Sequence, residues 1–465
     1  MGHVDEPQRK KGSLRFGTVL PNDKIPEDEE FDPFDRHIET PTSNIETYIH
    51  FIKGSIGTGC LAMPSGFKAV GYIFGLMFGI FTGGLCMLTL HLLMRIKYDV
   101  SKKMRYHVVQ FPDVCELVMA NGPPSLRWIS KPIPIVVDFF IFCNHLGICC
   151  VYINFIGENF NQACHHYFPG NGFNKLHWEI FATIIMIFMN QIRNLHFLSP
   201  ISTIGNFLLI IGLGLVFYYI FRDGDAPIVR KGETELFGEV YQIPLYMGTF
   251  LFAALGIGVL IAVEDEMKTP GDYRKKPFGL LNMGFVTITF IYLIIGVLGY
   301  WKYGQETEGS ITLNIPKHDQ LAIIVRLIFA GVIVFSYPIH FYVSIYILWT
   351  NYIKWRFETS GEERSSRQKT RLNIYEVIIR IILVIMSFLI TVLVTKLSFL
   401  ISLVGSFCLP ILGFLVPGLL DLTINLTEKK STHYSVIRDV FLIIFGLFFF
   451  VTGTFMGIAQ VINEK

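Results

Sequence analysis

The sequence predicts an all-α polytopic membrane protein with about eleven transmembrane helices. Of its 465 residues, 52% are hydrophobic and only 16% are charged, whereas about 25% of the residues of a soluble protein are charged. Apolar runs of roughly 20 residues, long enough to cross a bilayer, recur between Tyr48 and Val461. The lipid bilayer is therefore an expected partner. The net charge of +2 gives no reason to expect nucleic-acid binding.

The first 45 residues differ from the rest of the chain. They are charged, contain prolines and lack a sustained apolar period, as in NDKIPEDEEFDPFDRH at 22–37. Residues 1–45 are therefore predicted to be a disordered tail, and residues 46–465 the transmembrane domain. Because no signal-peptide h-region precedes the first span, that span is expected to direct membrane insertion.

Hydropathy places the membrane spans along the remaining residues. The fourth span is short and the eighth is long. The spans are Tyr48–Ala69, Tyr72–Met94, Ile133–Gly157, His177–Ile192, Leu198–Phe221, Ile243–Val263, Phe278–Trp301, Gln320–Tyr352, Ile374–Thr395, Leu397–Leu420 and Ile437–Val461.

Lys and Arg residues are concentrated in the loops after the second, sixth and eighth spans, as in YRKK at 273–276. Positively charged loops remain on the cytosolic side of a membrane. The sequence therefore predicts a cytosolic N-terminus and an extracellular or lumenal C-terminus. It does not distinguish a plasma membrane from a lysosomal or endosomal one.

The eight cysteines do not indicate a metal or redox site, because no CxxC or Cys/His metal spacing occurs. Most of them fall in apolar spans, and Cys115 falls in a charged loop. The stretch GSIGTG at 54–59 lacks the Gly-Lys-Ser/Thr ending of a phosphate-binding loop, so ATP coupling is not expected.

The first span contains a stretch that is poorly suited to a continuous helix. Residues 53–64 read KGSIGTGCLAMP, with Gly54, Gly57 and Gly59 within six positions. Each glycine in a helix interior costs roughly 1 kcal/mol relative to alanine. A second interruption, GIG at 256–258, lies at the centre of the sixth span. The sequence therefore predicts two broken helices.

The two interruptions match if residues 46–221 and 243–420 are repeats of five spans each, with residues 437–461 as an additional span. An odd number of spans gives the repeats opposite orientations, and interruptions at matching positions indicate a transporter binding site.

A helix broken within the membrane exposes backbone groups that can bind a ligand. N–H groups at the start of one half-helix suit a carboxylate, and carbonyl groups at the end of the other suit an ammonium group or a cation. An α-amino acid carries both groups. The alternative is close helix packing, because Gly54/Thr58 and Ser55/Gly59 form small-xxx-small pairs.

Several stretches resemble a known family. YIHFIKGSIGTGCLAMP at 48–64 is similar to the first span of the proton-coupled amino acid transporters, a branch of the amino acid/auxin permease family. The similarity continues in VVDFFIFCNHLGICCVYINFIGENF, QIRNL, GSITLNIP and FLISLVGS. This resemblance implies a LeuT-like 5+5 inverted repeat with one extra helix, and symport of small neutral amino acids with protons.

The resemblance also implies site residues. His50 stands where the family has a histidine implicated in proton coupling; it lies one helical turn before Gly54 and titrates near neutral pH. The proton is the only coupling ion expected, and no cofactor is expected. The predicted substrate-binding residues are Gly54, Ser55, Ile56, Gly57, Thr58, Gly59, Ala254, Leu255, Gly256, Ile257 and Gly258.

The chain departs from the family in two places. The motif before the second interruption is typically Phe-Glu-Gly-Ile-Gly, but this chain has Ala254 and Leu255 in place of the phenylalanine and the glutamate. The change removes a partner for a substrate ammonium group or a proton carrier. The loop after the seventh span also lacks the cysteine of an external disulfide.

Four further residues are candidates for functional roles. Lys53 is placed to pair with carbonyl groups near the break, in place of a cation, or with a carboxylate of the tail. His145 and His340 belong to the third and eighth spans, which line the site in this fold, and Tyr337 could close over a bound side chain. Each of these three also fits a packing role. Glu264, Asp265 and Glu266 are either an inner gate or a solvated cluster.

The leading hypothesis is a secondary transporter that moves small neutral amino acids with protons by alternating access. An uncoupled facilitator or exchanger is the alternative that Leu255 favours. An amino acid sensor with little net flux, signalling through unknown partners of the tail, is a second alternative. No enzymatic activity is predicted.

Overall fold

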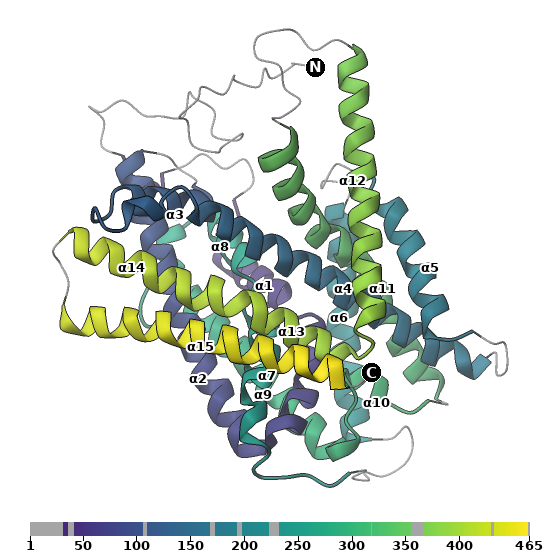
Figure 1. Cartoon of the computed structure of the whole chain (residues 1–465). Helices are drawn as coiled ribbons and strands as arrows, with labels where there is room; N and C mark the ends of the chain where they lie inside the picture. Colours follow the sequence, from purple (N-terminus) through teal and green to yellow (C-terminus); the bar gives the residue numbers. More distant parts are fainter. Residues whose placement is uncertain are drawn as a thin grey trace.

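The computed structural model describes residues 31–35, 41–105, 109–167, 173–192, 198–222, 232–317, 319–354, 366–428 and 432–463. Nearly all of them are helical, which confirms the all-α prediction (Figure 1). The helices are α1 (Asn44–Ser55), α2 (Thr58–Met104), α3 (Phe111–Ala120), η2 (Arg127–Ile129), α4 (Ile133–Tyr167), α5 (Lys175–Met189), α6 (Leu198–Phe221), η4 (Val240–Gln242), α7 (Ile243–Ala254), α8 (Ile257–Asp265), η5 (Pro270–Asp272), α9 (Leu280–Tyr303), η6 (Gly304–Glu306), α10 (Ile311–Asn314), α11 (Gln320–Ile345), η7 (Tyr346–Ile353), α12 (Ser366–Leu393), α13 (Leu397–Pro410), η9 (Ile411–Leu415), α14 (Val416–Thr427) and α15 (His433–Asn463).

Seven helices in the described part of the chain are long and apolar enough to cross a membrane. The boundaries of these helices differ from those of the predicted spans. Helix α2 contains the end of the first span and the whole second span, joined at Gly71 with φ +77°. The first and sixth spans are each broken in two, and α5 has only 15 residues. The count of eleven spans stays a prediction.

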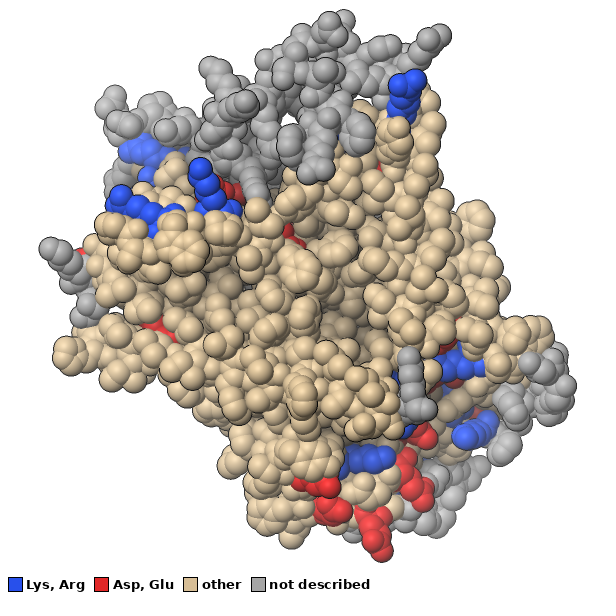
Figure 2. All heavy atoms as spheres, viewed as in Figure 1, with Lys and Arg blue, Asp and Glu red and all other residues tan. Residues whose placement is uncertain are grey.

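The surface agrees with a membrane location. Figure 2 shows charged side chains at two opposite ends of the visible face, with a wide uncharged region between them. Large apolar side chains point outward in this region; on α15, for example, Phe455 is 70% exposed. The opposite side of α15 packs against α13 through small residues, including Gly453 beside Ser406. The protein is thus a multi-pass integral membrane protein.

The buried apolar residues form two clusters. The first cluster joins side chains of α1, α2, α7 and α9 with those of α3, α14 and α15. The second joins side chains of α4, α5, α6, α11, α12 and α13. Ile56 and Phe252, which lie at or near the helix breaks, pack against both clusters. The breaks therefore lie where the two helix groups meet.

Helix α3 corrects one expectation of the sequence. Cys115 lies in this helix and is fully buried, not in a loop. The helix forms because Pro112 occupies its first turn and because Val114, Leu117 and Val118 provide an apolar side that packs into the first cluster.

Helix α1 begins at one end of the helix bundle. We call this end, which contains Thr42, the start of α1 and Met267, the N-terminal face. Ser43 and Glu46 form a capping box, and the hydrogen bonds from Ser43 lower the pKa of Glu46. Thr42 forms a parallel bridge with Met267 in the segment after α8. Most of the predicted tail, residues 1–30 and 36–40, lies outside the described residues, so its predicted disorder stays a prediction.

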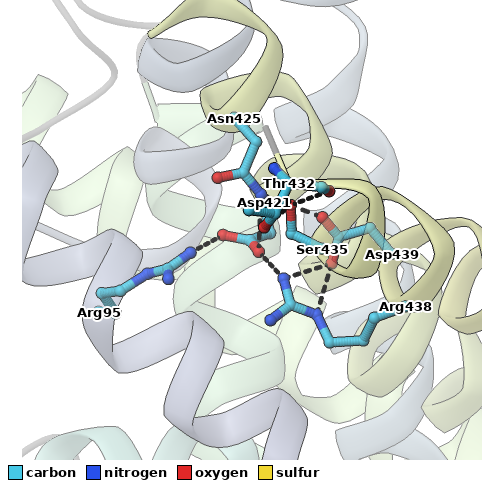
Figure 3. A network of polar contacts seen from close by, with 7 residues as sticks. All are labelled: Arg95, Asp421, Asn425, Thr432, Ser435, Arg438 and Asp439. Atoms are coloured by element: carbon cyan, nitrogen blue, oxygen red, sulfur yellow. Dashed lines mark hydrogen bonds and ion pairs between the residues drawn. The ribbon is translucent and has the colours of Figure 1, made fainter. Parts of the chain in front are cut away.

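A buried polar network ties the extra helix α15 to the rest of the bundle (Figure 3). Asp421 of α14 is fully buried and forms ion pairs with Arg95 of α2 and Arg438 of α15. Arg438 also pairs with Asp439 at 2.6 Å, and Asn425 donates to both Asp421 and Asp439 at 3.2 Å. Two arginines thus balance two aspartates, as a buried cluster of charges requires.

Candidate functional site

The first predicted interruption is a break between α1 and α2. Helix α1 ends at Ser55, and Ile56 and Gly57 are extended, with φ/ψ of −86°/114° and −153°/−154°. Helix α2 then begins at Thr58 without a side-chain cap. The Cys60 N–H donates to the Gly57 carbonyl at 3.1 Å, so the N–H groups of Thr58 and Gly59 are the ones that a ligand can use.

The second interruption is a break between α7 and α8. Helix α7 ends at Ala254, Leu255 has φ/ψ of −105°/66°, and α8 begins at Ile257 with Gly256 as its N-cap. The side chain of Ile257 and the surroundings of Gly258 lie outside the described part of the structure. Both breaks fall on the glycine-rich stretches that the sequence singles out.

The two breaks lie side by side. The backbone of Gly59 packs directly on α7, so that a Cβ atom at this position would lie 2.6 Å from the Cα atom of Ala253. Only glycine allows the start of α2 to approach α7 this closely. The residues of both breaks can therefore contact one small ligand.

Tyr292 of α9 connects the ends of the two broken helices. Its hydroxyl oxygen lies 2.5 Å from the Ser55 carbonyl oxygen and 2.8 Å from the Ala253 carbonyl oxygen, so the two carbonyls share the one hydrogen that it donates. The tyrosine is fully buried. Sequence reasoning missed this residue; the available signal was a phenolic hydroxyl in the middle of an apolar span, which needs a partner.

Leu255, the residue that replaces the family's glutamate, has an apolar environment. A Cβ atom at Gly413 of η9 would lie 2.2 Å from its Cδ2 atom. Its side chain also borders a narrow gap lined by Thr89, Leu90, Leu93 and Pro417. A carboxylate at this position would have no charged partner among these residues.

His50 and Lys53 lie on α1 away from its packed side. Thr47, Phe51 and Ser55 form the buried side of α1, whereas His50 is exposed and Lys53 is half-buried. Neither side chain forms a hydrogen bond or ion pair with any residue in the described ranges.

His145 of α4 and His340 of α11 face each other. Their Nδ1 atoms are 3.1 Å apart, and the ring of Tyr152 packs edge-on against His340 with centroids 5.5 Å apart. Tyr337 lies differently: its hydroxyl is 3.0 Å from the hydroxyl of Ser387, and its ring stacks on Phe341. The structure thus brings the histidines together, while Tyr337 packs between α11 and α12.

A known protein family matches most of this chain. The family described as transmembrane amino acid transporter protein matches residues 40–462. The chain belongs to this family.

Two relatives span nearly the whole transporter. The proton-coupled amino acid transporter-like protein pathetic of Drosophila melanogaster is 27% identical over 436 residues, covering 93% of this chain and 88% of that protein. The amino acid transporter AVT3C of Arabidopsis thaliana is 24% identical over 440 residues, covering 91% and 92%.

Solved structures show the fold of the transporter. The inward-facing structure of Mhp1 has a TM-score of 0.55 at 12% identity and covers 98% of this chain and 95% of that one. The structure of MhsT in complex with L-phenylalanine has a TM-score of 0.50 at 15% identity and covers 90% and 100%. These similarities confirm the LeuT-like fold.

The N-terminal face of the transporter carries ion pairs at the end of α8. Lys97 of α2 lies 2.6 Å from Asp265 and 3.6 Å from Glu264, and Arg274 lies 3.9 Å from Glu264. The guanidinium of Arg274 also lies over the Tyr98 ring, 5.1 Å from its centroid. Glu264 and Asp265 are thus paired with basic residues. Lys97 was missed as a partner because it falls beyond the predicted second span.

Proposed function

We propose that this amino acid transporter moves small neutral amino acids together with protons by alternating access. The observation that carries the proposal is the pair of helix breaks, which lie in contact where the two helix groups meet. N–H groups at the start of α2 would bind the substrate carboxylate, as the partial positive charge at a helix N-terminus favours.

The preference for small neutral substrates follows from the residues around the breaks. Ser55, Ile56, Thr58, Ala254 and Leu255 carry no charge. A charged substrate side chain would lack a counter-ion among them, which makes its burial unfavourable. The close packing of Gly59 against Ala253 also leaves little room beside the substrate backbone.

Coupling to a proton is favoured by the hydrogen bonds of Tyr292. Carbonyl groups at unwound helix ends can coordinate sodium in this class of transporter. Here the Ser55 and Ala253 carbonyls already face the Tyr292 hydroxyl, whose one hydrogen they share. His50, exposed one turn before Gly54, would carry the coupled proton.

Alternating access is supported by the division into two helix groups. The broken helices belong mainly to the first cluster, and α4 and α11 belong to the second. Rocking of one group against the other would expose the breaks first to one side of the membrane and then to the other.

Uptake by purified full-length protein in liposomes tests this function. We expect saturable uptake of labelled small neutral amino acids that increases when the outside is acidified from about pH 7.5 to about pH 5.5, a range that brackets histidine titration. An uptake rate that does not change with the outside pH would support the uncoupled facilitator. Saturable binding without uptake would support the sensor.

A tail deletion separates transport from signalling. Removal of residues 1–30 leaves Phe34, whose ring contacts Tyr98 with centroids 4.7 Å apart. We expect uptake by this variant to match that of the full chain. Loss of uptake, with normal protein yield and monodispersity, would contradict a purely signalling role of the deleted segment.

A further inference from the structure

A cluster of charged residues lies at the face opposite the N-terminal face, away from both breaks. Its centre is Lys175, at the start of α5. The lysine ammonium donates to Glu158 at 2.7 Å and to the Asn154 side chain at 3.1 Å, both on α4. It also donates to the backbone carbonyl of Thr395, in the connection between α12 and α13, at 2.5 Å.

Glu179 lies one helical turn after Lys175 and is 3% exposed. Its Oε1 atom is 3.7 Å from the lysine Nζ atom, beyond hydrogen-bond distance. This oxygen is buried and has no hydrogen-bond donor among the residues that the structure describes. The carboxyl group therefore has a cation nearby but no hydrogen bond from it.

The shortage of donors has a simple cause. A lysine ammonium group has three hydrogens, and three acceptors other than Glu179 already lie around it. Lys175 and Glu158 balance each other in charge, so an ionised Glu179 adds an uncompensated negative charge in a buried position. Burial of such a charge without hydrogen bonds is strongly unfavourable.

We propose that Glu179 is a proton-binding site of the transporter, distinct from His50. A hydronium ion on the side opposite the N-terminal face gives a proton to the carboxylate: one O–H bond of the hydronium ion breaks, one forms on Glu179, and a neutral carboxyl group and a water molecule result. The position is shaped for this side chain, because a Cβ atom at Gly157 of α4 would lie 2.4 Å from the Glu179 Cγ atom. The partly exposed Lys175 and Glu158 provide the contact with solvent.

The other titratable groups described around α5 do not supply a positive charge to compensate an ionised Glu179. His177 is occupied with the N-cap residue Asn174. Lys396 lies over the ring of Phe399. Glu308, in the segment before α10, adds negative charge near Glu158.

The arginines of the neighbouring helices α12 and α11 bind other groups. On α12, Arg380 pairs with Glu376 and bonds to the carbonyl of Asn190 at the other end of α5. On α11, Arg326 donates to the carbonyls of Thr312, Ile315 and Pro316. The side chains at 165–172 lie outside the described residues.

The site is linked to the transport machinery through Lys175. An ionised Glu179 competes for the ammonium hydrogens and so weakens the bond to Thr395, which precedes Lys396, the N-cap residue of α13. Helix α13 packs closely on α7, where Gly405 lies against the Gly248 carbonyl. Proton binding at Glu179 would therefore favour the arrangement of α13 and α7 described here; this consequence for uptake rests on the proposed function.

Infrared difference spectroscopy of the full chain in lipid nanodiscs tests the site without relying on transport. Between about pH 5.5 and about pH 7.5, we expect the C=O stretch of a protonated carboxyl group to decrease in the wild type. Glu179→Gln should abolish this difference band, and Glu239→Gln, which removes an exposed carboxylate before α7, should retain it. Glutamine mimics the protonated form, so Glu179→Gln should fold, as size-exclusion chromatography would verify.

A difference band that is unchanged in Glu179→Gln, or no pH-dependent band in the wild type, would overturn the proposal. The pH profile of uptake then tests the link to transport: Glu179→Gln should reduce the acid stimulation, whereas Glu239→Gln should preserve it. Absence of uptake in the wild type would contradict the proposed function and leave the infrared result as the test of the proton site.

Discussion

The Tyr292 hydroxyl contacts the last turns of both α1 and α7. Tyr292→Phe removes the one hydrogen that the two buried carbonyls share, which costs on the order of 1–3 kcal/mol. If about 1.4 kcal/mol of this loss appears in substrate binding, the apparent KM of uptake rises about tenfold. Labelled uptake and thermal unfolding of the purified variant measure both effects.

Tyr246→Phe is the matched control for this prediction. Tyr246 is also fully buried, and its hydroxyl donates to the Gly75 carbonyl at 2.6 Å, away from the breaks. We expect a comparable loss of thermal stability but an unchanged KM. An unchanged KM in both variants would show that Tyr292 does not position the site.

At the residue scale, the sequence predicted the breaks better than the contacts between them. The glycines at 54–59 and 256–258 mark weak helix, and that signal is local. Tyr292 is distant in sequence from both breaks, so its role depends on packing that no local pattern reveals. The meeting of His145 and His340 was anticipated only because they belong to spans that line the site in this fold.

At the scale of elements, the contact between the start of α2 and α7 depends on Gly59. Gly59→Ala would place a Cβ atom 2.6 Å from the Ala253 backbone and force the two breaks apart. We expect almost complete loss of uptake, with the protein still inserted in the membrane. Flux measurements on protein quantified at the membrane check this result.

Gly84→Ala provides a control on the same helix. A Cβ atom at Gly84 would meet nothing within 4 Å, and alanine stabilises a helix by up to roughly 1 kcal/mol relative to glycine. Uptake should therefore be retained. Equal loss of uptake in both variants would mean that α2 tolerates no substitution, and would contradict a specific role of Gly59.

The contact of α15 with α2 and α14 is expected to contribute to stability. Asp421→Asn leaves Arg95 and Arg438 without their shared carboxylate, and loss of one partner from a buried ion pair costs about 3–5 kcal/mol. Because the Arg95 side chain is 45% exposed, the lower end of this range is expected. Thermal unfolding in detergent measures the change.

Asp272→Asn is a suitable comparison for Asp421→Asn. Asp272 is only half-buried, and hydrogen bonds from Asn44 and Thr269 lower its pKa. Its substitution should change the unfolding temperature little. A small shift for Asp421→Asn as well would show that the network in Figure 3 does not hold α15 to the bundle.

At the scale of the whole molecule, composition and hydropathy were sufficient to predict an all-α membrane protein. The repeat boundaries and the number of spans were harder to predict, because helix breaks and the junction at Gly71 divide apolar runs in ways that hydropathy does not register. The orientation in the membrane remains a prediction from the Lys and Arg distribution.

The central claim is that amino acid and proton cross the membrane together. The most direct measurement is simultaneous recording of current and labelled uptake in oocytes at about pH 5.5 and about pH 7.5. We predict amino-acid-dependent inward current that increases with acidity, in proportion to uptake, and that disappears in His50→Ala while surface expression persists. Uptake without current at either pH would contradict proton symport and would identify the protein as an uncoupled facilitator.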